Sequence, residues 1–189
     1  QSFAPPPRMY VFGAIDFAAA VARAGKFMGY RVIVCDARAV FATRERFPSA
    51  DEIVVAWPDE FLKTAEVDGR SVIAVLTHDP KFDVPVLKEA LKTPAGYIGA
   101  MGSRRTHDNR TARLKEEGVT DEQLARISSP IGLDIGARTP EETAIAIAAE
   151  IVALRTGHSG GRLAERSGPI HSATPDTRAD ATAGGENAR

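Results

Sequence analysis

Short apolar runs alternate with amphipathic segments over the first hundred residues, and this alternation predicts strands and helices in turn. The apolar runs are nearly unbroken, as in strands that are buried on both faces of a parallel sheet. The predicted strands are residues 9–12, 30–35, 53–56, 71–76 and 97–100.

Strands alternating with helices imply βαβ units with right-handed crossovers. We therefore expect an α/β fold with a doubly wound, Rossmann-like parallel sheet in the strand order 3-2-1-4-5. Ligands bind such sheets outside the carboxyl ends of the strands, where the strand order reverses. The loops after the first, second, fourth and fifth strands are therefore the candidate site.

The helices are marked by apolar spacing and by capping residues. Residues 17–28 repeat apolar side chains at spacings of four, three and four, and Gly29 follows as a helix C-cap. Asp79 followed by Pro80 is typical of a helix start. A basic helix is expected over 103–118.

The C-terminal part contains one strong helix signal. Residues 120–126 predict a short helix, and 128–137 predict a loop with a short strand. Thr139 and Glu142 form a capping box, and the helix that they begin, 140–155, is apolar on more than one face. Such a helix lies centrally in its domain or is covered by another copy of the chain.

Composition restricts organisation and partners. We expect an extended leader at 1–7, a Rossmann-like domain at 8–156 and a mostly disordered tail at 157–189.

With 24 Lys and Arg against 25 Asp and Glu, no bulk charge favours nucleic acid or anionic membrane. No apolar run approaches the roughly 20 residues that span a bilayer. Cys35 is the only cysteine, which fits a reducing, cytoplasmic compartment. The chain begins without methionine or a signal peptide, as a part of a longer protein would.

The first candidate loop, in VFGAIDFA, is an incomplete dinucleotide fingerprint. Gly13 and the final alanine of G-x-G-x-x-G/A are present and Ala14 follows Gly13, but Ile15 stands at the middle glycine, beside Asp16. A β-branched side chain and a neighbouring anion oppose the close approach of a pyrophosphate. The alternative is a tight strand-to-helix connection in which Asp16 caps the helix.

The second loop carries Asp36 and Arg38. An acid at the end of the second strand, about twenty residues after the glycine turn, is where a ribose hydroxyl acceptor is expected. Arg38 is a candidate for pairing with a phosphate. The alternative is a surface pair of Asp36 with Arg38 or Arg31.

The third loop carries Thr77, His78 and Asp79 at the end of a central strand. His78 is placed to donate to an anion or to act as an acid or base. The alternative is a histidine held by Asp79 or by a backbone group. No serine or cysteine lies in a recognisable nucleophile elbow, and no second histidine is spaced for a metal pair.

The loop after the fifth strand has the most informative pattern. Two glycines allow the backbone to turn, and the helix that follows begins with two arginines. Cations in the first helical turn face the positive end of the dipole, which costs up to about 1 kcal/mol. Free amides and arginines at a helix start form an anion site. The alternative is a solvated basic face that includes His107, Arg110 and Arg113. The candidate residues are Gly99, Met101, Gly102, Ser103, Arg104 and Arg105.

Taken together, these segments resemble the Rossmann-type domain of the XdhC/CoxI family. The resemblance covers most of residues 9–171, and its most specific part is GAMGSRR combined with SPIGLDIGARTPEE. The matching segments are the Gly13 turn, RVIVCDAR (31–38), RFPSADEIV (46–54), LTHDPKFDVPVLKEAL (76–91), YIGAMGSRRT (97–106), ARLKEEGV (112–119), RISSPIGLDIGARTPEETAIAIAAEIVALR (126–155) and GPIH (168–171).

The resemblance implies a maturation factor for molybdenum hydroxylases such as xanthine dehydrogenase and CO dehydrogenase. Such a factor binds molybdenum cofactor, as molybdopterin or its dinucleotide form, and protects it while a cysteine desulfurase supplies the terminal sulfur. It then helps to insert the cofactor into the apo hydroxylase. The expected role is a cofactor chaperone without catalytic residues, and the family motif adds Pro130, Gly132 and Asp134 to the cofactor-binding candidates.

Two features depart from the family pattern. The first turn commonly reads GAGHVA in the family, whereas this chain has GAIDFA at residues 13–18. The family's smaller N-terminal domain is also absent from this sequence. We therefore expect the ligand to be held mainly by the loop after the fifth strand.

Two other functions stay open from the residues alone. An NAD(P)-dependent oxidoreductase would need the first loop to admit a dinucleotide, which Ile15 and Asp16 oppose, and would depend on His78 as its acid or base. A non-catalytic regulatory or dimerisation module is the second alternative, supported by the broad apolar surface of helix 140–155. That surface also predicts a homodimer for the chaperone.

Overall fold

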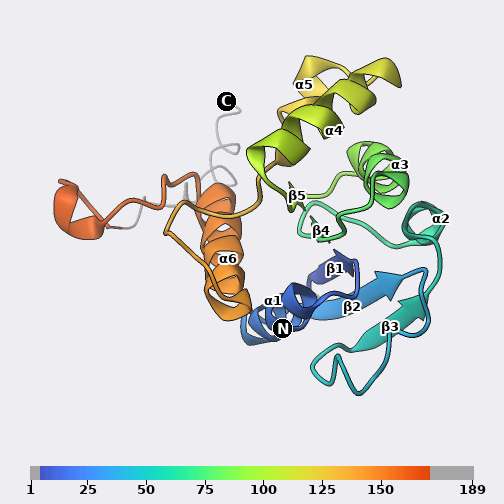
Figure 1. Ribbon diagram of the computed structural model, residues 1–189. Helices are drawn as coiled ribbons and strands as arrows, with labels where there is room; N and C mark the ends of the chain where they lie inside the picture. The colour runs from blue at the N-terminus through green and yellow to red at the C-terminus, as the bar shows by residue number, and fades with distance from the viewer. Residues whose placement is uncertain (1–4, 171–189) are drawn as a thin grey trace, which may run out of the picture.

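The computed structural model describes residues 5–170 and has a Rossmann-like α/β fold (Figure 1). The strands are β1 (Arg8–Phe12), β2 (Arg31–Asp36), β3 (Glu52–Val55), β4 (Val72–Val75), β5 (Tyr97–Ala100) and β6 (Ile127–Ser128). They form one parallel sheet in the order β3-β2-β1-β4-β5-β6. The predicted fold class and the order of the first five strands are confirmed.

The helices pack on both faces of this sheet. They are α1 (Asp16–Phe27), α2 (Pro58–Thr64), α3 (Pro80–Leu91), α4 (Arg104–Glu116), α5 (Asp121–Leu124) and α6 (Pro140–Thr156), followed by a 3-10 turn at Leu163–Glu165. Helices α1 and α6 lie against each other on one side, whereas α2, α3 and α4 cover the other side (Figure 1).

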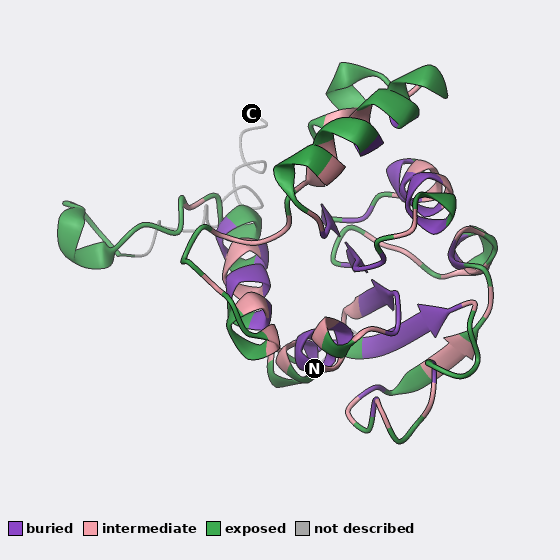
Figure 2. Cartoon of the chain, in the orientation of Figure 1, coloured by how far each residue is buried: buried purple, intermediate pink, exposed green. Residues whose placement is uncertain are grey.

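Alternating strand residues supply two separate cores, which is why the strands are apolar at nearly every position. Val11 and Val34 belong to the core beneath α1 and α6, together with Ile147 of α6. Phe12 and Ile33 belong to the core beneath α2, α3 and α4. Strands β1, β2, β4 and β5 are therefore largely buried between two layers of helices, whereas β3 at the edge of the sheet is only partly buried (Figure 2).

One C-terminal prediction needs adjustment. The short strand expected within 128–137 begins one residue earlier and ends at Ser128, because Ile127 pairs with Ile98 of β5. Helix α6 has the predicted capping box, and its buried residues lie on more than one side of the helix: Ala144, Ala146, Ile147, Ile151 and Ala153. Of the predicted tail and leader, residues 171–189, including His171 of the GPIH motif, and residues 1–4 lie outside the described residues. No helix among residues 5–170 has the length and apolar character needed to cross a membrane.

Candidate functional site

The first loop is held tightly against the loop after β4. Gly13 has φ 103°, a conformation that favours glycine, and its amide donates to the Cys35 carbonyl at 2.9 Å. A side chain at Gly13 would place its Cβ 2.8 Å from the Thr77 backbone nitrogen. Gly13 is therefore required for the contact between the β1 and β4 loops, whether or not a ligand binds.

Asp36 joins the first and second loops. Its Oδ2 accepts from the Ala14 amide at 2.7 Å and from Arg38 Nη2 at 2.8 Å, and its Oδ1 accepts from the Arg38 amide and Nε, both at 2.9 Å. Burial opposes ionisation of Asp36, but the hydrogen bonds from Arg38 and Ala14 outweigh it and lower the pKa of the carboxyl. The Asp36–Arg38 pair considered from the sequence is therefore present, with Asp36 buried rather than at the surface.

The sequence alternative in which Asp16 caps α1 is wrong. Ile15 is the N-cap, without a side-chain cap hydrogen bond, and Asp16 is the first helical residue. Asp16 instead accepts from Arg46 Nη2 at 3.0 Å, and Arg46 Nη1 donates to the Ala14 carbonyl at 3.0 Å. Arg46 thus contacts the two residues on either side of Ile15 in the first turn.

The loop after β4 contains a helix cap and a buried hydroxyl. Asp79 is the N-cap of α3 and accepts from the Lys81 amide at 3.1 Å. The Thr77 hydroxyl donates to Asp83 Oδ1 at 2.6 Å. His78 lines a hollow of about 210 Å³ between α3 and α4, which Asn109 also lines.

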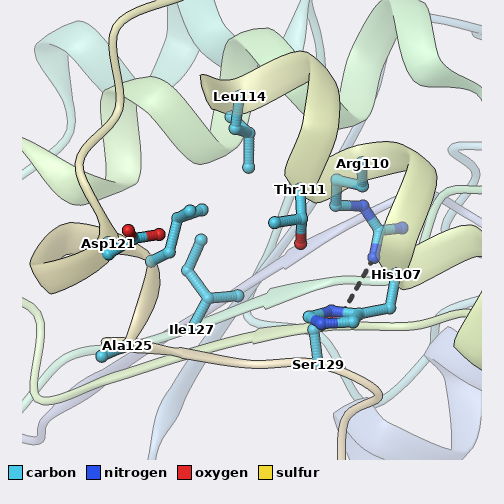
Figure 3. A pocket seen from close by; sticks show the side chains of 9 residues that line it. His107, Arg110, Thr111, Leu114, Asp121, Ala125, Ile127 and Ser129 are labelled. Atoms are coloured by element: carbon cyan, nitrogen blue, oxygen red, sulfur yellow. Dashed lines mark hydrogen bonds between the residues drawn. The ribbon is translucent and has the colours of Figure 1, made fainter. Parts of the chain in front are cut away.

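A buried ion pair that the sequence did not predict connects this loop to α4. Arg110 and Asp83 are 5% and 2% exposed, and Arg110 Nη2 donates to Asp83 Oδ2 and to the Met101 carbonyl, both at 2.7 Å. Arg110 Nη1 also donates to Ser129 Oγ at 3.2 Å (Figure 3). Burial raises the pKa of the Asp83 carboxyl, while the hydrogen bonds from Thr77 and Arg110 act in the opposite direction.

Arg110 therefore links α3, through Asp83, to the loops that follow β5 and β6. The sequence alternative that placed Arg110 on a solvated basic face is wrong, because Arg110 is buried and its partners come from other elements. The sequence contains one indication of this ion pair, which is Asp83 in the otherwise apolar stretch FDVPV. A carboxylate on a buried helix face requires a cationic partner.

The loop after β5 leads from this buried pair to an exposed helix start. The Met101 amide donates to the Val75 carbonyl at 2.8 Å, which anchors the loop to β4. Gly102 has φ 148° and packs against Thr106. Ser103 is the N-cap of α4 and accepts from the Thr106 amide at 3.2 Å.

Arg104 and Arg105 occupy the first turn of α4 and are exposed. Among the described residues neither forms a salt bridge, although other arginines of the chain do. The first turn also contains no acidic residue. The helix dipole and both guanidinium groups therefore present positive charge at one exposed place.

The SPIGLDIGA loop is fixed by its backbone. The Gly132 amide donates to Glu150 Oε2 at 2.8 Å, and a side chain at Gly99 would place its Cβ 2.5 Å from Ile131. Gly99 and Gly132 thus allow this loop to pack beside β5 and α6. Pro130 and Asp134 are exposed.

The structure brings the predicted residues together to different degrees. Gly13, Ala14, Asp36, Arg38 and Thr77 form one connected group. Met101 and the α4 start join this group through the β5 anchor and the Arg110 network. Pro130 and Asp134 take no part in the hydrogen bonds among these loops in the described chain. Within residues 5–170 no cluster of three or more His, Cys, Asp or Glu side chains has a metal-binding arrangement.

Residues 9–151 match the family model described as the XdhC Rossmann domain. The chain belongs to the XdhC Rossmann-domain family. It is 33% identical over 155 residues to a Bacillus subtilis protein named as a probable subunit of xanthine dehydrogenase, and the match covers 82% of this chain and 45% of that protein.

Two further relatives support the same placement in the family. The Escherichia coli molybdenum cofactor insertion chaperone PaoD is 34% identical over 92 residues, covering 49% of this chain and 29% of PaoD. A crystal structure described as that of a xanthine dehydrogenase from Bacillus halodurans superposes with a TM-score of 0.71 at 30% identity, covering 83% of this chain and 45% of that one. The XdhC-type domain described here thus spans less than half the length of these relatives.

Proposed function

We propose that this domain binds molybdenum cofactor as cargo and contributes to its insertion into a molybdenum hydroxylase of the xanthine dehydrogenase or CO dehydrogenase type. Membership of the XdhC family and the similarity to a chaperone named for molybdenum cofactor insertion support this proposal. The task is to hold an anionic, reactive ligand and release it, which requires a binding site and no catalytic residue.

The observation that carries the proposal is the start of α4. Arg104 and Arg105 are exposed, lack salt bridges within residues 5–170, and follow Gly102 and Ser103 at the carboxyl edge of the sheet. Molybdopterin ends in a phosphate, or in a pyrophosphate in its dinucleotide forms. A phosphate at this place would receive backbone amides and two charge-assisted hydrogen bonds, each contributing roughly 1.5–3 kcal/mol.

The other candidate residues have supporting roles in this proposal. Gly13 and Ala14 form the turn beside the β4 loop, while Asp36 fixes the Arg38 guanidinium. Arg38 is the residue placed for a second phosphate of a dinucleotide form. Thr77, His78 and Asp79 border the same carboxyl edge, with Thr77 attached to Asp83. Gly99 in β5 leaves room for the loop that follows β6, which contains Pro130, Gly132 and Asp134.

Two protein partners follow from the proposed task. Sulfuration of the bound cofactor requires a cysteine desulfurase, and insertion requires the apo hydroxylase, so at least one side of the bound cofactor must stay accessible. A cytoplasmic location is part of the proposal because these partners act on an intracellular cofactor.

We also propose a homodimer formed through α6. Ile145 and Val152, seven residues apart on one side of this helix, are 60% and 39% exposed, and Leu154 on the opposite side is 55% exposed. Burying Ile145 and Val152 against a second copy would remove their apolar area from water. Light scattering at tens of micromolar should give twice the chain mass. A monomeric mass would refute this contact.

The functional test is transfer of cofactor. The chain would be loaded with cofactor released from a molybdoenzyme, separated by gel filtration and mixed with apo hydroxylase. The proposal predicts that pterin and molybdenum co-elute with the chain and then appear in the hydroxylase. Absence of both from the loaded chain, alone and when joined to an N-terminal domain of the family, would refute the chaperone function.

A further inference from the structure

A second hollow lies on the neighbouring side of α4 from the hollow that His78 lines, and Arg110 lines both. It has a volume of about 260 Å³ and is enclosed by α4, α5 and β6 (Figure 3). Its apolar wall consists of Leu114, Leu124, Ala125 and Ile127. Leu114 from α4 and Ile127 from β6 point toward each other across it (Figure 3). Apolar walls with a few polar groups are typical of small-molecule pockets.

The polar groups of this hollow are positioned by the buried ion pair. Ser129 Oγ accepts from Arg110 Nη1 at 3.2 Å, so the serine hydroxyl keeps its own proton to donate to another group. Arg110 is in turn fixed by Asp83 and the Met101 carbonyl, and its buried Nε has no hydrogen-bond partner among the described residues. His107 and Thr111 add further hydrogen-bonding groups from α4.

The hollow lies on the same helix face as Arg104. Arg104, His107, Thr111 and Leu114 follow one another at spacings of three, four and three, which places them along one side of α4. From Arg104 to Thr111 the helix rises about 10 Å, at 1.5 Å per residue. An extended ligand with an anionic end at the start of α4 would therefore reach the hollow with its other end.

The volume restricts what that other end is. About 260 Å³ lies just below the range of roughly 300–1,000 Å³ found for pockets that hold drug-sized ligands. It suits one planar fused ring system and is too small for a ring together with a nucleotide. Asp121 at the rim, in an ion pair with Lys115 at 2.7 Å, supplies a carboxylate that accepts from amino and ring N–H groups.

We propose that the hollow between α4, α5 and β6 binds the pterin ring of the cargo, while the α4 start binds its phosphate. This assignment rests on the proposed function and adds to it a site for the heterocycle that is separate from the hollow lined by His78. The nucleotide of a dinucleotide form would then lie outside the hollow.

The test uses unsubstituted pterin, which lacks the phosphate, and follows its fluorescence during titration with the protein. Thr111→Leu extends a larger side chain into the hollow, whereas Ala112→Leu changes the neighbouring exposed residue of the same helix. Wild type should bind pterin saturably, and Thr111→Leu should raise the dissociation constant at least about tenfold, or about 1.4 kcal/mol. Ala112→Leu and the Arg104→Ala, Arg105→Ala double variant should bind pterin as wild type does.

Ala125→Leu is a second filling variant, and circular dichroism melting confirms that each variant folds. Wild-type affinity for pterin in both folded filling variants would overturn the assignment. Retention of whole cofactor by a wild type that does not bind pterin would also overturn it, yet leave the proposed function in place. Failure to bind either pterin or whole cofactor would refute the proposed function as well.

Discussion

Replacing Arg110 by methionine tests the buried network that holds the site together. The change removes the guanidinium from Asp83, from the Met101 carbonyl and from Ser129 while keeping an apolar side chain of similar length. Asp83 is 2% exposed and would keep only its hydrogen bond from Thr77 among these contacts. Removing one partner of a buried ion pair costs about 3–5 kcal/mol, since an uncompensated charge stays inside.

This loss is large against the roughly 5–15 kcal/mol by which domains are stable. At about 2–4 °C per kcal/mol, the melting temperature of Arg110→Met should fall by about 6–20 °C. Urea unfolding followed by circular dichroism at pH 7 measures the free energy directly. The matched control is Arg113→Met, an exposed arginine on the same helix, which should change stability by less than about 0.5 kcal/mol.

The double variant Asp83→Leu, Arg110→Met separates the pair from its side chains. Replacing both members of a buried ion pair by apolar residues is often neutral or stabilising. The Thr77 hydroxyl, which loses Asp83 as its acceptor, still has the Asp79 carbonyl at 3.5 Å. The double variant should therefore recover much of the lost stability. Unfolding of Arg110→Met at the wild-type urea concentration would refute the stabilising role of Arg110, and so would a double variant that is no more stable than Arg110→Met.

Three further predictions concern the first two loops. The hydrogen bonds of Asp36 lower its pKa below the ordinary 3.8, so its ionised form stabilises the fold above pH 3.8, and this stabilisation is lost as pH falls through the lower folded pKa. In urea titrations, Asp36→Asn should therefore have a lower free energy of unfolding than wild type above pH 3.8, and the difference should disappear below the folded pKa. A difference that stays constant with pH would contradict this. Burial raises the pKa of Cys35 to about 12, so a thiol reagent at pH 8 should label Cys35 only after denaturation, and rapid labelling of the native chain would contradict the buried position. NAD(H) and NADP(H) should bind weakly or not at all by calorimetry, since Ile15 opposes pyrophosphate approach and the Asp36 carboxylate is held by Ala14 and Arg38; a low-micromolar dissociation constant for either would reinstate Asp36 as a ribose acceptor.

The fold could be predicted because local pattern and tertiary environment agree. Residues 97–100 read as a strand and form β5, and the capping box at Thr139 and Glu142 begins α6. Strand β6 is harder to predict, since two residues at Ile127 and Ser128 carry no periodicity. Its existence depends on pairing with Ile98 and Gly99, which local sequence does not encode.

The candidate site was only partly predictable. The carboxyl-edge loops follow from the strand order, and Asp36 with Arg38 is a local pair that spacing can suggest. The Arg110–Asp83 pair joins residues 27 apart, so the basic pattern of α4 alone cannot distinguish a buried arginine from the exposed Arg104 and Arg105. That distinction determines which arginines hold the structure and which are free for a ligand.

The central claim is that Arg104 and Arg105 hold the anionic end of molybdenum cofactor. Wild type, the double variant Arg104→Ala, Arg105→Ala and the charge-matched control Arg138→Ala, Arg155→Ala would be loaded with released cofactor. Pterin and molybdenum retained after gel filtration would then be measured. With roughly 1.5–3 kcal/mol per charge-assisted hydrogen bond, the first double variant should bind at least about a hundredfold more weakly, while the control retains cofactor like wild type. Equal retention by wild type and a folded Arg104→Ala, Arg105→Ala variant would contradict the claim.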